Sequence, residues 1–223
     1  MLNRHLLLIL GPALALAPRP ALPHEHWVDA ADLTPRVGQE VAVWLASGHH
    51  FPESDTVIAD RLIDRLVLRK PGRPPEPVAT EAQDRRRAGA VRPDRPGAHL
   101  LELVLRRPPR REPEAYARAI LFVSSDEPDA DGTVPATGEG LELVPLRLPH
   151  TLPDGEELRI ELRRDGEPVA GVITYYAGDS RPRWVRATAT EPARLKVTAG
   201  TRYLFASAHQ GQSVTLVFQT GAP

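Results

Sequence analysis

Short runs of alternating apolar and polar residues recur along most of the chain after residue 24. In QEVAVWLAS the apolar side chains of Val41, Val43 and Leu45 share one face, and AHLLELVLRR is a longer, largely apolar run. Further runs in the second half are LRIELRR, VAGVITYYA, ARLKVTA, RYLFASA and SVTLVFQ. Side chains alternate with a period of two along a strand, and Gly and Pro turns bound these runs. The pattern predicts an all-β fold.

Residues 124–138 form a polar, acidic segment that is rich in Gly and Pro. Such a composition is typical of a linker. It would separate an N-terminal domain, residues 24–123, from a C-terminal domain, residues 139–223. Each half holds enough short strands for an antiparallel β-sandwich, immunoglobulin-like or transthyretin-like, and DGEPVAGVITYY in the second half is similar to transthyretin-like modules.

Helix is expected in few places, because the 24 prolines leave few uninterrupted stretches of helical length. In RLIDRLVLR the apolar residues keep helical spacing, although the same residues could end a loop and begin a strand. EPEAYARAILFV could likewise open with one helical turn.

The first 23 residues differ in pattern from the rest of the chain. A basic start at Arg4 is followed by an apolar run from Leu6 to Ala17 and by small residues. This order is typical of a secretory signal peptide, and the run is shorter than the roughly 20 residues that span a bilayer. We expect a signal peptide and short mature leader over residues 1–23, cleavage between Ala15 and His24, and a periplasmic protein. An uncleaved anchor is the alternative.

Charge and cysteine content narrow the classes of partner. The formal net charge is −1, and acidic residues are interspersed among the arginine clusters, so we expect no nucleic-acid partner. The chain has no cysteine, which excludes disulfides and lipid attachment at a cysteine. That content fits an exported protein and a cytosolic one equally well.

Four of the eight histidines form two pairs. His24 and His26 stand in HEHWVD, and His49 and His50 stand in SGHHFPESD. In a strand, His24 and His26 project from one face. If the segments on either side of the TPRVG turn pair antiparallel, His24 lies opposite residue 48 and His26 opposite residue 46. Both pairs then meet at the same end of the ladder.

This arrangement predicts a divalent metal site, because imidazole nitrogens on one face are common transition-metal ligands. His24 and His26 would form one half, His50 in preference to His49 the other, and His209 is the candidate closing ligand. Nickel, cobalt, zinc and copper all suit imidazole. Since neutral imidazole is the ligand, binding should weaken as the pH falls through about 6.5. A solvated histidine pair is the ordinary alternative.

An enzyme is not expected. The sequence contains no G-x-S-x-G elbow, phosphate loop or H-E-x-x-H motif. A metal hydrolase would also need a carboxylate base, and Glu53 and Asp55 beside the second histidine pair are the candidates. A solvated loop is the favoured interpretation of both, and Asp29 should point to the face opposite the histidines.

Several segments, in this order and spacing, resemble one periplasmic family: HEHW, VGQEVAVWLASGHHFPESD, RPGAHLLELVLR, EAYARAILFV, GEGLELVPL, DGEPVAGVITYY and GTRYLFASAHQGQSVTLVF. The family consists of domains of unknown function that are called nickel uptake transporter family proteins, the NikK- or CbiK-like periplasmic components. This chain departs from it at His26, where many members have an aromatic residue, and at His99, where tyrosine is usual. The resemblance implies nickel or cobalt handling beside a membrane metal transporter.

Two functions therefore compete. The favoured one is an exported periplasmic metal-binding accessory protein for nickel or cobalt uptake. The other is an adhesion or carbohydrate-binding β-sandwich module of the cell envelope with incidental histidines. It would need exposed aromatic residues in a groove, yet aromatic residues make up only 5% of the chain.

Overall fold

The computed structural model describes residues 25–106, 109, 113–124 and 134–221. The predicted signal peptide and leader, His24, and residues 125–133 of the predicted linker lie outside the described residues. Within the described part, no helix is long and apolar enough to cross a membrane.

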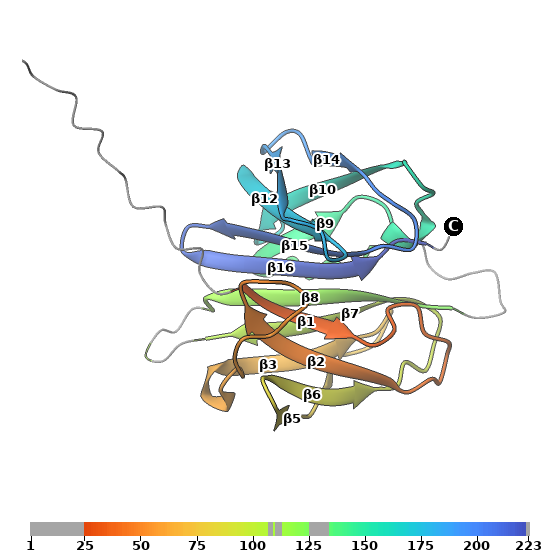
Figure 1. Cartoon of the computed structure of the whole chain (residues 1–223), viewed down its shortest axis with the longest axis vertical. Coiled ribbons are helices and arrows are strands. Elements are labelled where there is room, and N and C mark those ends of the chain that lie inside the picture. The colour runs from red at the N-terminus through yellow and green to blue at the C-terminus, as the bar shows by residue number, and fades with distance from the viewer. Residues whose placement is uncertain (1–24, 107–108, 110–112, 125–133, 222–223) are drawn as a thin grey trace, which may run out of the picture.

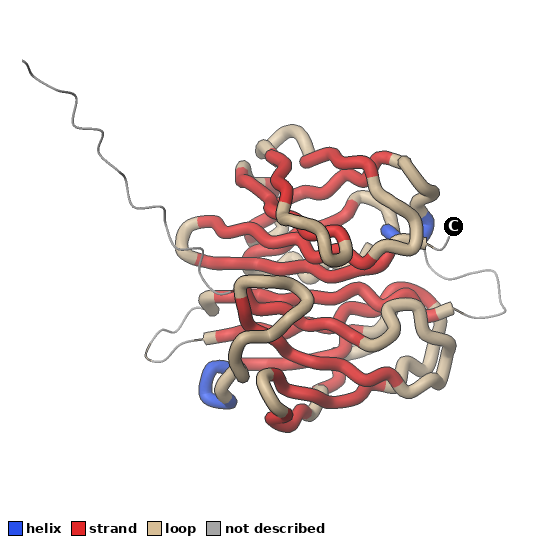
Figure 2. The backbone as a smooth tube through the Cα atoms, in the orientation of Figure 1, coloured by secondary structure: helices blue, strands red, loops and turns tan. Residues whose placement is uncertain are grey.

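Strands make up most of the described structure, so the prediction of an all-β fold is confirmed (Figures 1 and 2). In the N-terminal half they are β1 (Glu25–Ala30), β2 (Val41–Gly48), β3 (Ile63–Arg69), β4 (Glu76–Pro77), β5 (Thr80–Gln83), β6 (Arg86–Val91), β7 (Gly97–Leu105) and β8 (Ala115–Val123). In the C-terminal half they are β9 (Leu141–Pro145), β10 (Glu157–Arg164), β11 (Glu167–Pro168), β12 (Gly171–Ala177), β13 (Arg183–Ala187), β14 (Ala193–Lys196), β15 (Arg202–His209) and β16 (Gln212–Gln219).

The described helices are two single 3-10 turns, η1 (Asp60–Leu62) and η2 (Pro149–Thr151). The helix considered at RLIDRLVLR is therefore wrong beyond η1, because β3 begins at the next residue, Ile63, and pairs with β7. The helical turn considered at the start of EPEAYARAILFV is also wrong within the described residues, because β8 begins as a strand at Ala115.

The two sequence halves share one sheet. Its eight strands follow the order β13-β12-β15-β16-β8-β7-β3-β4. The central neighbours β8 and β16 come from different halves and pair in parallel, from Ala115 beside Ser213 to Ala119 beside Val217 (Figure 1). The boundaries 24–123 and 139–223 thus divide the sequence but not this sheet, and independent domains stay a prediction.

Two hydrophobic cores lie on opposite faces of the shared sheet. Along β7, Leu101 and Leu103 pack in the core with β1 and β2, whereas Leu100 and Val104 pack in the core with β9 and β10. The four-stranded sheet β1-β2-β6-β5 covers the first face, and β9, β10, β11 and β14 cover the second. Burial on both faces explains why β7 is an almost continuous apolar run rather than an alternating one.

Candidate functional site

The β1–β2 ladder places His26 at the same end as the second histidine pair. Glu25 pairs with Gly48 and His26 with Ser47, and His49 and His50 follow Gly48 directly. The register expected from sequence, with His26 opposite residue 46, is wrong by one residue. The strands still end together, so His26 and the second pair lie at the same end of the ladder.

Asp55 positions His49. One oxygen, Oδ2, lies 3.1 Å from Nδ1 of His49 and accepts the His49 backbone N–H at 3.0 Å. These hydrogen bonds from His49 hold the pKa of Asp55 below its usual value. An Nδ1–H donated to the carboxylate leaves the ring's lone pair on Nε2, the arrangement in which second-shell carboxylates orient metal-binding imidazoles. Asp55 therefore suits a positioning role better than that of a base.

The loop that carries the second histidine pair is anchored in the N-terminal core. Phe51 is buried and meets Trp27 edge-on, with 5.8 Å between the ring centroids. His50 itself is exposed, and its carbonyl accepts the Glu53 N–H at 2.8 Å. Between the two histidines, His49 is the one that interacts electrostatically with Glu25 of β1.

Glu25 is a residue of this region that sequence reasoning overlooked. Burial raises the pKa of its carboxyl to about 7, and the nearby His49 offsets the rise only in part. Its Oε2 atom is buried, and no hydrogen bond from the described residues reaches it. No sequence signal marks Glu25, because its burial arises from the packing of β1 against β16.

His26 lines two cavities. The first, here the hairpin cavity, has a volume of about 570 Å³ and lies between β1, the Thr56–Ile58 segment and the β15–β16 hairpin. The second, here the sheet cavity, has a volume of about 410 Å³ and lies between β1 and the sheet formed by β12, β15 and β16. The Thr215 hydroxyl donates to the His26 carbonyl at 2.6 Å, which holds β1 on β16.

His209 ends β15 and pairs with Gln212 in the hairpin. Its neighbour Ala208 lines both cavities, whereas His209 lines neither. Because side chains alternate along a strand, His209 projects to the face opposite Ala208. The hairpin thus approaches His26 while its histidine points to the other side of the sheet.

Within the described part of the chain, no three His, Cys, Asp or Glu side chains form a group that could hold a metal ion. His24, which directly precedes Glu25, lies outside that part. The described candidates are therefore His26 and the loop with His49 and His50, and the full ligand set stays a prediction. His99 and His150, read from the sequence as ordinary structural residues, are respectively buried in β7 and stacked on Phe122.

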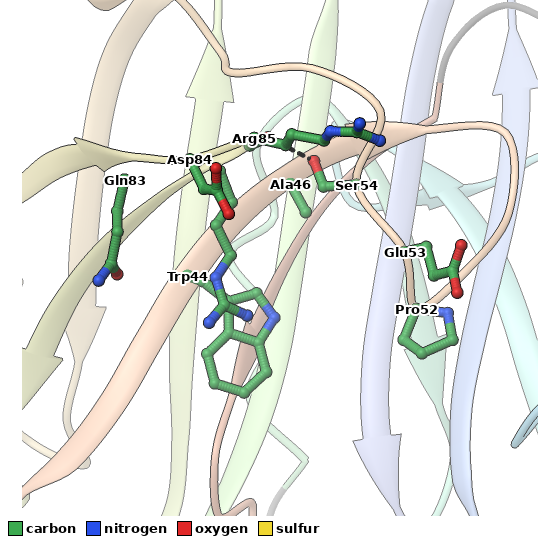
Figure 3. A pocket seen from close by; sticks show the side chains of 9 residues that line it. Trp44, Ala46, Pro52, Glu53, Ser54, Gln83, Asp84 and Arg85 are labelled. Carbon is green, nitrogen blue, oxygen red and sulfur yellow. Dashed lines mark hydrogen bonds between the residues drawn. The ribbon is translucent and has the colours of Figure 1, made fainter.

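A third cavity lies between β2, the β5–β6 hairpin and the loop of residues 49–56, here the histidine loop. The Ser54 hydroxyl donates to the Arg85 carbonyl at 2.8 Å and so ties the loop to the β5–β6 hairpin (Figure 3). Beside it, the Arg86 guanidinium lies 4.8 Å from the centroid of the Trp44 ring. One face of Trp44 is therefore occupied by the protein itself, which fits a packing role.

Asp29 lies on β1 and binds Arg202 of β15 at 3.0 Å. Burial raises the pKa of Asp29 from 3.8 to about 6, although Arg202 and the Ala30 N–H partly offset this effect. A carboxyl with a raised folded-state pKa binds its proton more tightly in the folded protein. Its contribution to stability is therefore lost as the pH rises from about 4 to about 6.

We expect an Asp29→Asn variant to lack this pH dependence. One pKa unit corresponds to about 1.4 kcal/mol, so wild type should lose about 3 kcal/mol of stability relative to the variant across that window. Denaturant unfolding of both proteins at a series of pH values measures the difference. Parallel stability curves would contradict the assignment.

A family model described as "Domain of unknown function (DUF4198)" matches residues 21–211. The chain belongs to this family. A comparison with curated proteins found no match. Membership of DUF4198 bears out the resemblance to a family of domains of unknown function, while nickel or cobalt uptake goes beyond the match.

Solved structures similar to this DUF4198 chain include repeats of β-sandwich domains. A two-domain fibronectin type III segment of chicken tenascin is 12% identical and covers 86% of this chain and 97% of its own, with a TM-score of 0.27. A chimeric titin Z1Z2 tandem is 13% identical and covers 90% and 100%, with a TM-score of 0.29. The all-β fold class rests on the strands described above.

Proposed function

We propose that this DUF4198 protein is an exported, periplasmic metal-binding accessory protein of nickel or cobalt uptake. The observation that carries the proposal is the β1–β2 ladder, which brings His26 to the same end as the loop with His49 and His50. The hydrogen bond from His49 to the Asp55 carboxylate adds support, because it fixes the imidazole in an orientation suited to a ligand.

In this proposal His24 and His26 supply one half of the site, and His49 or His50 supplies the other. His209 is kept as the candidate closing ligand, although it would have to come from the opposite face of the sheet. Imidazoles bind copper, nickel, zinc and cobalt, and copper is expected to bind most tightly. Nickel is proposed as the natural metal on the strength of the family resemblance, with a membrane metal transporter as the partner.

Export is part of the proposal and is supported by the signal-like pattern of residues 1–23. A non-catalytic role is proposed because Asp55, the candidate base nearest the histidines, is already engaged with His49. Nucleic acid is not proposed as a partner, since the arginine clusters are interspersed with acidic residues.

One observation favours the alternative, an envelope adhesion or carbohydrate-binding module. Trp184 on β13 is 69% exposed, and an exposed indole is a common platform for a sugar or a partner surface. The other candidate platform, Trp44, already carries Arg86 on one face. The alternative therefore stands second, and it requires no contribution from the histidines.

Removal of the first histidine pair tests the proposal. A His24→Ala/His26→Ala variant should bind nickel at least about 100-fold more weakly than wild type, which exceeds the 10–100-fold loss typical of an outer-shell change. Asp55→Asn should fall within that outer-shell range. Calorimetric titration of the natively processed protein with nickel, zinc and copper measures these affinities.

One result of that titration decides between the functions, and a second defines the ligand set. Equal affinity in wild type and the double variant would refute the histidine site and leave the adhesion or carbohydrate-binding alternative. An unchanged affinity in a His209→Ala variant would remove only His209 from the ligand set.

A further inference from the structure

On one side of β1 the shared sheet is covered only in part, where Phe51 packs on Tyr176 of β12. β1 is the outermost strand of the sheet β1-β2-β6-β5, while the eight-stranded sheet beneath it continues through β16 and β15 to β12 and β13. On these outer strands Val172 is 45% exposed and Trp184 is 69% exposed. The sheet cavity lies beside β1, at the edge of the four-stranded sheet that covers this face.

Small side chains form the floor of the sheet cavity. The pairing of β12, β15 and β16 sets Thr174 beside Ala206 and Ala206 beside Thr215. In the next row, Ala208 lies beside Ser213. These short side chains leave a volume of about 410 Å³. That volume lies within the range of pockets for small organic molecules.

The two sides of the cavity differ in chemistry. His26 and Glu25 of β1 line one side. At the other side, the pairing of β12 and β13 sets the exposed Arg186 beside Val172, which itself lines the cavity. An imidazole thus lines one end of the cavity, and an arginine, a preferred partner of carboxylates, lies on the strand next to the other end.

We propose that the sheet cavity binds the metal as a complex with a small hydroxy- or aminocarboxylate. This inference rests on the proposed function. His26 would bind the metal, Arg186 a free carboxylate of the chelator, and the hydroxyls of Thr174 and Ser213 its remaining oxygens. A few imidazoles leave coordination positions of the metal unfilled, and a chelator supplies oxygen ligands for them. A nickel–citrate complex also carries a negative charge, which Arg186 complements.

Equilibrium dialysis of the natively processed protein against nickel–citrate tests this inference, with nickel and citrate both quantified. Wild type should retain the two in equal amounts. Ala208→Trp, which fills the floor at an exposed position, should lower citrate retention about tenfold or more while aquated nickel binds within about twofold of wild type. An unchanged circular dichroism spectrum would show that this variant is folded.

Arg186→Ala should also lower citrate retention about tenfold, because it removes a charge-assisted contact. Arg183→Ala is the matched control, since Arg183 lies on the same strand but pairs with Tyr175 and projects to the opposite face. Its citrate retention should equal that of wild type.

Three results would overturn the inference: nickel retained without citrate, citrate that strips nickel from the protein, or Ala208→Trp with wild-type citrate retention. Each of them leaves the proposed function intact as long as aquated nickel still binds through the histidines. Loss of nickel binding in every form would instead refute the proposed function.

Discussion

Replacing Glu102 with alanine is expected to lower the free energy of unfolding by about 3–5 kcal/mol, the range for breaking a buried ion pair. Glu102 of β7 and Arg118 of β8 are both almost inaccessible to solvent, with 3.6 Å between Arg118 Nε and Glu102 Oε2. Arg65 and Arg69 of β3 also donate to Glu102, at 2.7 and 3.1 Å. Without the carboxylate, Arg118 would remain as a buried cation that has lost one of its partners.

Two further partners of Arg118 belong to the C-terminal half. Its guanidinium donates to the Leu141 carbonyl at 2.7 Å and lies 3.7 Å from Glu142 of β9. Burial alone would raise the pKa of Glu102, but Arg118, Arg69 and Arg65 outweigh it and hold that pKa below the usual value. The ionised carboxylate therefore stabilises the fold at neutral pH, and this contribution is lost as the pH falls below the usual glutamate range.

Thermal and denaturant unfolding at neutral pH measures the effect of Glu102→Ala. Glu157→Ala is the matched control, because Glu157 pairs with Arg159 at 2.8 Å on the exposed surface. Exposed pairs contribute about 0–1 kcal/mol, so the control should unfold close to wild type. A loss below about 1 kcal/mol for Glu102→Ala would show that the arginines find other compensation.

Trp27→Ala is the second change with a large expected effect, about 3–5 kcal/mol of stability. Trp27 is fully buried in the N-terminal core and contacts Phe51 of the histidine loop. Its removal leaves a cavity and takes away the surface on which this loop rests. Nickel affinity should therefore fall together with stability, although Trp27 is not a ligand.

Trp184→Ala provides the comparison, since the same side chain is removed from an exposed position. Surface substitutions usually change stability by less than about 0.5 kcal/mol. Denaturant unfolding and nickel titration of both variants make the test. A Trp27→Ala protein with wild-type nickel affinity would show that the loop holds its position without the core contact.

The sequence by itself determined the all-β class and the positions of several longer strands, among them β2, β7, β10, β15 and β16. The alternation in QEVAVWLAS predicted β2, with Val41, Val43 and Leu45 buried as expected. It also predicted that β1 and β2 pair around their turn, although the register was one residue out. Such features are local, because a period of two and a nearby turn are visible within a few residues of sequence.

Only the tertiary structure decided how the two halves meet. The parallel pairing of β8 with β16 joins strands nearly a hundred residues apart, and nothing in the local pattern of either strand names its partner. The burial of Glu25, the face on which His209 lies and the sheet cavity all follow from that pairing and from β1 lying across β16. A sequence pattern shows which face of a strand is apolar, but the layer that covers this face, and the point at which the cover ends, depend on contacts between distant segments.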